Sequence, residues 1–73
     1  HKAGVECSLL LEVIVNEKGR VEDANVVYSS QPGYGFEQSA LKAVRKLRFK
    51  PFEINGEKVK VKIVYPIDFI LVE

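Results

Sequence analysis

The chain has 73 residues, of which 47% are hydrophobic and 29% are charged. A chain of this length has material for one small core, so we expect residues 1–73 to fold as a single domain. The acidic and basic residues nearly cancel, at a formal net charge of +1, which gives little long-range attraction to nucleic acid or to anionic lipid.

The sequence carries no targeting or membrane-spanning signal. No apolar run approaches the roughly 20 residues that cross a bilayer, and the N-terminus lacks the charged, apolar and small-residue pattern of a signal peptide. Because the chain begins at His1 and not at methionine, we expect it to be a fragment of a longer protein.

Residues for catalysis or metal binding are scarce. The single histidine is His1, at the terminus, and the single cysteine, Cys7, has no base near it in the sequence. Glu6, Glu12 and Glu17 do not have the spacing of metal ligands with a histidine or a second cysteine. We therefore expect no enzymatic activity, no metal and no cofactor.

Cys7 is expected to be a small buried hydrophobic residue. The alternative is a disulfide that links two chains in an oxidising compartment.

The segment Cys7–Val15 has the alternation of a β-strand. One face is entirely apolar and comprises Leu9, Leu11, Val13 and Val15. The other face is half apolar because it carries Leu10 and Ile14, so we expect a preceding segment or a second copy of the chain to cover part of it. A turn over residues 16–20 follows, in which Gly19 supplies the positive φ that hairpin loops require.

A second strand and a helix come next. The strand is expected over Val21–Tyr28, with Ala24, Val26 and Tyr28 alternating on its core side. The loop over residues 29–35 contains one proline and two glycines, and Gly35 or a neighbour is expected to be the helix N-cap.

The helix is expected to begin at Phe36 and to be ended by Pro51. Its apolar stripe comprises Phe36, Ala40, Ala43, Val44 and Leu47, and its opposite side carries Gln38, Lys42, Arg45 and Lys46. Glu37 lies in the first turn while Arg45, Lys46 and Arg48 are expected in the last, as the helix dipole favours.

A long third strand shows the clearest pattern in the chain. After a turn built on Asn55-Gly56, apolar residues alternate without a break at Val59, Val61, Ile63, Tyr65, Ile67, Phe69 and Leu71. The other face is largely solvent-facing and reads Lys58, Lys60, Lys62, Val64, Pro66, Asp68 and Ile70.

These elements predict an α+β fold of ββαβ type, in which one helix covers one face of a three-stranded antiparallel sheet. The helix returns along the sheet, so the third strand runs in the direction of the second and must pair beside the first. The expected strand order is therefore 2-1-3. Pro66 supports this order because a proline inside a strand is tolerated mainly at an open edge.

Backbone groups along this edge should face outward at the residues that share the parity of Pro66, which are Lys58, Lys60, Lys62 and Val64. Lysines and proline are common devices that protect an edge strand from unwanted pairing. The pattern alone leaves two interpretations open, namely edge protection and a site that accepts an added strand.

Basic residues gather near the end of the expected helix, at Lys42, Arg45, Lys46, Arg48 and Lys50. Such a cluster can meet phosphates. No aromatic residues interleave with the basic residues on that face of the helix for base stacking, so a solvated helix face is favoured over a nucleic-acid partner.

Several motifs in this order resemble the TonB C-terminal domain family. They are Glu17-Lys18-Gly19-Arg20-Val21, then Ser29-Ser30 with a proline and glycine loop, Ala40–Val44, Leu47-Arg48-Phe49-Lys50-Pro51, Asn55-Gly56 and Pro66-Ile67-Asp68-Phe69. Each motif is weak alone, but the ordered set is specific and covers nearly the whole chain. The sequence departs from the family at Cys7, where glycine is common, and the usual upstream Tyr-Pro segment is not in this sequence.

The resemblance implies the same ββαβ fold and a mechanical function. Such a domain lies in the periplasm of a Gram-negative envelope, at the far end of a linker anchored in the inner membrane. It binds the TonB box of an outer-membrane transporter, for example in siderophore uptake, by adding that peptide beside its last strand. Force then comes from the proton-driven ExbB and ExbD motor.

On this chain the implied partner strand lies along Lys58–Tyr65 and stops near Pro66, which has no donor. The implied partner-binding residues are Lys58, Lys60, Lys62, Val64 and Tyr65. For Tyr65 a place on the core face is the competing interpretation, and for Lys60 and Lys62 it is simple solvation.

Two other functions stay open at this point. TonB-like domains also resemble scaffolding or self-association modules of other envelope proteins, such as sensors or membrane peptidases. A small nucleic-acid-binding domain is the third and least favoured function. The half-apolar second face and two free sheet edges also make a homodimer an alternative for a truncated form.

Overall fold

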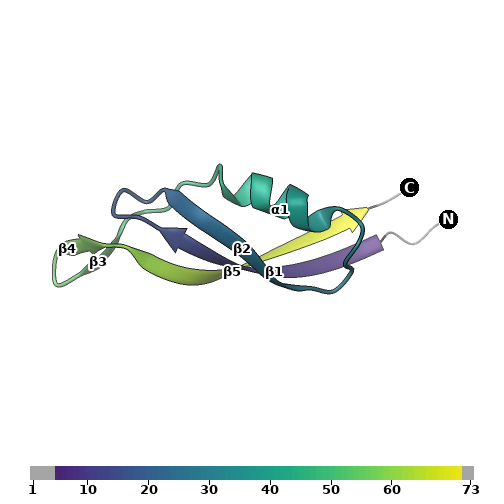
Figure 1. The fold of residues 1–73 in the computed structure, drawn as a ribbon. Helices are drawn as coiled ribbons and strands as arrows, with labels where there is room; N and C mark the ends of the chain where they lie inside the picture. The colour runs from purple at the N-terminus through teal and green to yellow at the C-terminus, as the bar shows by residue number, and fades with distance from the viewer. Residues whose placement is uncertain (1–4, 72–73) are drawn as a thin grey trace.

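The structure, a computed structural model, describes residues 5–71 and contains one helix and five strands (Figure 1). Their bounds are β1 Val5–Val15, β2 Val21–Ser29, α1 Phe36–Val44, β3 Phe52–Ile54, β4 Glu57–Val59 and β5 Val61–Leu71. A three-stranded antiparallel sheet has the order β2-β1-β5, and α1 lies over one of its faces (Figure 1). The expected α+β fold and strand order are confirmed. No helix within residues 5–71 has the length and apolar character needed to cross a membrane.

The core lies between α1 and the sheet. It takes the apolar face of β1 and three positions of α1, and its buried residues are Cys7, Leu9, Leu11, Val13, Val15, Ala24, Phe36, Ala40 and Val44. Each fully buried leucine or valine contributes about 1.5–3 kcal/mol of stability relative to an exposed one. Cys7 belongs to this core, with its Sγ 3.6 Å from Oγ of Ser29, so the expected burial of the cysteine is confirmed.

Strand β2 contains an irregularity that changes which face its last residues occupy. Leu11 pairs with Val26 and Leu10 pairs with Tyr28, so Val27 has no counterpart on β1. Such a β-bulge reverses the alternation of the residues after it. Tyr28 therefore points away from the core and is 53% exposed, and the prediction that it shares a face with Ala24 and Val26 was wrong.

The helix is shorter than the sequence predicts. It ends at Val44, and the amide of Leu47 already bonds to the carbonyl of Val44 at 3.1 Å in a tight turn. The chain then pairs with the β1–β2 turn, because the Phe49 amide donates to the Gly19 carbonyl at 2.8 Å. The helix therefore ends well before Pro51.

Two other expectations about the helix were wrong. Ala43, expected in the apolar stripe, is exposed, whereas Leu41 packs partly buried against the core. Arg45, Lys46 and Arg48 lie beyond the helix, so Lys42 is the basic residue of its last turn.

The long third strand of the prediction is divided between two strands, β4 and β5. Phe52–Ile54 and Glu57–Val59 form a small hairpin, β3-β4, at the end of the sheet away from the start of β1 and the end of β5 (Figure 1). Asn55 and Gly56 connect these strands with φ of 52° and 83°, and two successive positive φ values are typical of a type I′ turn. Lys60 separates β4 from β5, and only β5 joins the main sheet.

Candidate functional site

The candidate binding surface is the open side of β5. This strand pairs along its whole length with β1, from Val15↔Val61 to Val5↔Leu71, and is the last strand of its sheet. At about 3.4 Å per residue, its eleven residues offer an edge of roughly 35 Å within the described part of the chain. A second peptide strand can therefore lie along β5 without displacing another strand of the sheet.

Side chains of β5 alternate between two environments. Val61, Ile63, Tyr65, Ile67 and Phe69 pack partly buried against the core. Their neighbours Lys62, Val64, Pro66, Asp68 and Ile70 are exposed on the face opposite α1. The predicted one-sided alternation is confirmed for residues 61–70.

The five residues expected to bind a partner are not all brought together. Lys62 and Val64 are exposed on β5, where they pair in register with Ile14 and Glu12. Tyr65 is on the opposite, core-facing side of the same strand.

Lys58 and Lys60 lie outside β5. Lys58 is in β4, opposite Glu53, and its Nζ is 3.8 Å from the Glu53 carboxylate. Lys60 connects β4 to β5. Sequence reasoning missed this division because Lys60 and its neighbours continue the same apolar and polar alternation.

Lys60 is engaged by a carboxylate on the far side of the central strand. Its Nζ lies 2.9 Å from Oε1 of Glu22 on β2. The hydrogen bond and the charge of Glu22 raise the pKa of Lys60 above the ordinary lysine value of 10.5, and the charge of Glu17 adds to this effect. The ammonium is therefore directed toward β2 and not toward the open side of β5.

Tyr65 is held by an aromatic contact that the sequence pattern did not indicate. Its ring meets the ring of Phe49 edge to face, with centroids 5.8 Å apart and planes at 89°. The Phe49 amide is in turn bonded to Gly19. These contacts agree with the interpretation of Tyr65 as a core-face residue.

A second aromatic group lies toward the other end of β5. Phe36, the first residue of α1, stacks on Phe69 with ring centroids 5.3 Å apart. This contact places the start of α1 over the last part of β5. The ring centroid of the exposed Tyr34 lies 5.9 Å from that of Phe36. The signal in the sequence was the two aromatic residues on either side of Gly35, but pairing with Phe69 depends on the tertiary fold.

The face of the sheet opposite α1 carries an exposed apolar row. Leu10 lies in register with Tyr28 on one side and Pro66 on the other. All three are exposed, and so is Val64, which is the next residue of β5 on the same face. Nothing within residues 5–71 covers this row, whose central residue Leu10 is 39% exposed.

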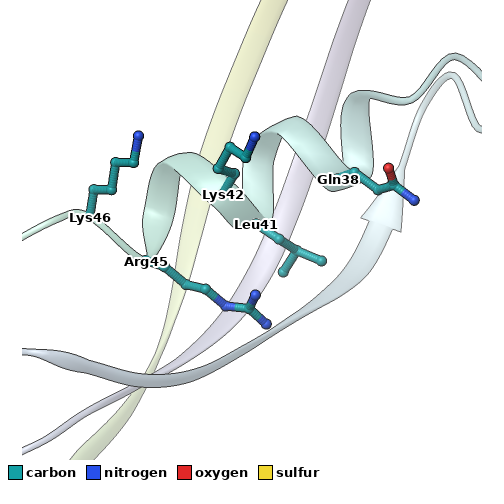
Figure 2. Close-up of a pocket in the computed structure, with 5 residues that line it drawn as sticks. All are labelled: Gln38, Leu41, Lys42, Arg45 and Lys46. Carbon is teal, nitrogen blue, oxygen red and sulfur yellow. The ribbon is translucent and has the colours of Figure 1, made fainter.

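Basic side chains surround a hollow on the other side of the molecule, on α1 (Figure 2). The lining residues are Gln38, Leu41, Lys42, Arg45 and Lys46. Within residues 5–71 no group of three or more histidine, cysteine, aspartate or glutamate side chains is placed to hold a metal ion.

Comparison with known proteins gives consistent results over nearly the whole chain. The family described as "Gram-negative bacterial TonB protein C-terminal" matches residues 1–71. Proteins named "Protein TonB" from two strains of Xanthomonas campestris pv. campestris are each 31% identical over 70 residues, which is 96% of this chain. The chain spans 31% of the length of these relatives.

Proposed function

Because the chain belongs to the TonB C-terminal domain family, we propose that it is the periplasmic binding module of a TonB-like energy transducer. In this proposal it captures the TonB box of an outer-membrane transporter as an added strand on β5. The part of the protein outside this chain anchors it in the inner membrane of a Gram-negative envelope and couples it to ExbB and ExbD. The module itself is not an enzyme and needs no cofactor.

The observation that supports this proposal most is the open edge of β5. Pro66 lies within β5 opposite Leu10. A proline nitrogen cannot donate to a ladder, so it is best tolerated on the open side of an edge strand. By alternation, the N–H and C=O groups of Lys62 and Val64 then face the same open side. These two residues are the centre of the proposed site, with Lys58, Lys60 and Tyr65 at its margins.

Strand addition also suits a linkage that carries force. A peptide pulled along its own axis loads all of its backbone hydrogen bonds together, so none has to break first. Each such bond contributes a net of about 0.5–1.5 kcal/mol, and the contribution depends little on side chains. The same edge can therefore accept different transporter peptides, for siderophores or other cargo, if their backbones can extend.

The test is a titration of isotope-labelled protein with a synthetic TonB-box peptide, followed by backbone amide shifts. We expect shifts concentrated between Lys58 and Tyr65 and new exchange protection at the amides of Lys62 and Val64. Lys62→Pro removes one outward donor and should abolish binding with the fold intact, whereas Lys62→Gln keeps the donor and should bind. Equal binding by both variants would show that the peptide does not use this edge.

The exposed row of Leu10, Tyr28 and Pro66 favours a second candidate, a scaffolding or self-association module. A second copy that covers this row, or that pairs along β2 or β5, would produce a homodimer. Sedimentation of the wild-type chain and of Leu10→Ser separates the candidates. A dimer that Leu10→Ser dissociates, together with no response to the TonB-box peptide, would support self-association in place of energy transduction.

A further inference from the structure

The hollow on α1 is built from one helix and the turn that follows it. Gln38, Leu41 and Lys42 come from α1, and Arg45 and Lys46 come from the turn (Figure 2). Their side chains border a hollow of about 390 Å³ that is open to solvent, and this volume is within the range of about 300–1,000 Å³ that is usual for ligand pockets. In Figure 2, Lys42 and Lys46 rise from one side of the helix, while Leu41 and Arg45 point to the other.

The hollow combines one apolar side chain, Leu41, with three positively charged ones. Leu41 is partly buried and packs against the core, so it is fixed in place. Three cationic side chains and one amide line the hollow together with Leu41, and no carboxylate is among the lining residues. The ion pairs that the structure records within residues 5–71 engage Lys58 and Lys60, outside the hollow.

The helix dipole explains why one of these three positive charges lies at the end of α1, but not the other two. The carbonyl end of a helix attracts a cation, and Lys42 in the last turn supplies one. Arg45 and Lys46, which line the same hollow, add two more positive charges. An anion bound in the hollow would reduce the repulsion among Lys42, Arg45 and Lys46.

We propose that this surface is a second docking site, which binds an acidic peptide segment of a partner protein. One aliphatic side chain of the segment packs on Leu41, and flanking carboxylates pair with Lys42, Arg45 and Lys46. The site is separate from the β5 edge because α1 packs mainly over β2, at the opposite side of the sheet. A partner can therefore occupy both surfaces at once.

A peptide fits this site better than a membrane or a nucleic acid does. The hollow is small and has one apolar lining residue, Leu41, whereas a lipid surface or a phosphate chain would need a broad basic face. The whole chain has a formal net charge of only +1, so acidic residues elsewhere oppose a large polyanion. No aromatic residue lines the hollow to stack on a base.

The test measures binding of a fluorescent peptide made of glutamate and leucine, with a second peptide in which glutamine replaces every glutamate. The protein is compared as wild type, as Lys42→Gln/Lys46→Gln, and as Lys18→Gln/Lys50→Gln. The two double variants lose the same charge, but Lys18 and Lys50 are exposed residues outside the hollow. Vesicles of phosphatidylglycerol and phosphatidylcholine serve as a membrane probe.

We expect the acidic peptide to bind the wild type and the Lys18/Lys50 variant alike, and to bind the Lys42/Lys46 variant about fivefold more weakly. Binding should fall as salt is raised, and the glutamine peptide should not bind. Equal weakening in both variants would reduce the effect to net charge and overturn the proposal. Binding to the vesicles and not to the peptide, or no binding at all, would also overturn it. None of these outcomes affects the amide shifts that test strand addition on β5.

Discussion

The ammonium of Lys60 lies 2.9 Å from the carboxylate of Glu22, and this ion pair reaches across the end of the central strand. Val15 on β1 pairs with Val21 on one side and with Val61 on the other, and Glu22 and Lys60 are the neighbours of these two partners. Glu22 has no counterpart on β1, because the register shifts between Ile14 and Val15. Regular pairing would place Glu22 opposite Val15 on β1. The bulge leaves Glu22 without a partner on β1, and its carboxylate pairs with Lys60 instead.

The first prediction concerns the titration of Lys60. Glu22→Gln removes both the hydrogen bond and the largest nearby charge, so the pKa of Lys60 should fall toward the ordinary value of 10.5. Glu17→Gln removes only a smaller charge effect and should lower the pKa less. Side-chain NMR of labelled lysine across alkaline pH measures both. A larger fall in the Glu17 variant would contradict the assignment of Glu22 as the main cause.

The sign of this shift also fixes its effect on stability. The folded-state pKa of Lys60 is raised, so the contribution of the ion pair is fully present below about pH 10.5 and is lost as pH rises through the folded value. Because both side chains are exposed, the contribution is expected to be small. Wild type and Glu22→Gln should therefore differ in thermal stability at neutral pH and converge at strongly alkaline pH.

The second prediction concerns Gly19, where the turn meets the chain after α1. A Cβ on this residue would collide with the carbonyl oxygen of Phe49, and the residue has φ of 82°. Gly33 has a similar φ of 94°, but a Cβ there would meet nothing within 4 Å. Gly33→Ala should cost about 1 kcal/mol through its backbone alone. Gly19→Ala should cost at least about 2 kcal/mol, because the collision must also be relieved.

Urea unfolding of the two glycine variants gives this comparison directly. Equal losses would mean that the approach of Phe49 to the turn is loose. The comparison also tests the pairing of the chain after α1 with the β1–β2 turn, since the Phe49 amide bonds to the Gly19 carbonyl at 2.8 Å. If that approach is tight, Gly19→Ala should increase amide exchange at Phe49 more than Gly33→Ala does.

The third prediction separates the two faces of the sheet. Tyr28 is 53% exposed, so Tyr28→Ser should change the free energy of unfolding by no more than about 0.5 kcal/mol. Val13 is fully buried, and Val13→Ala should cost about 2 kcal/mol. If chemical unfolding showed Tyr28→Ser to cost as much as Val13→Ala, the bulge at Val27 would be wrongly placed.

Tyr28 also shows where sequence reasoning reached its limit. Alternation within one strand predicts faces only while every residue has a partner, and the skipped residue Val27 is set by the register with β1. In contrast, the core face of residues 9–15, the edge position of Pro66 and the Asn55-Gly56 turn were all predicted correctly. Each of these depends on local alternation or on the backbone preference of one residue type.

The helix end and the candidate site illustrate the same division. Pro51 is a strong local signal, but the helix ends at Val44, and the chain beyond it pairs with the β1–β2 turn through the Phe49 amide. At the site, the alternation of the sequence predicted that Lys60 is on the exposed face, but its ion pair with Glu22 joins segments far apart in the chain. Contacts of that kind require the register of three strands, which no single segment encodes.

The fourth prediction concerns Tyr65, whose position decides whether it serves the core or a partner. Its ring meets that of Phe49 edge to face at 5.8 Å, a contact worth about 0.5–1.5 kcal/mol beyond the area it buries. A double-mutant cycle with Phe49→Leu, Tyr65→Leu and both together should therefore return a coupling energy in that range.

The conservative variant Tyr65→Phe keeps the ring and should retain that coupling. It should also bind the TonB-box peptide as wild type does, because the ring packs toward Phe49 while the peptide lies along the strand edge. Loss of peptide affinity in Tyr65→Phe, with stability unchanged, would instead assign the hydroxyl to the partner.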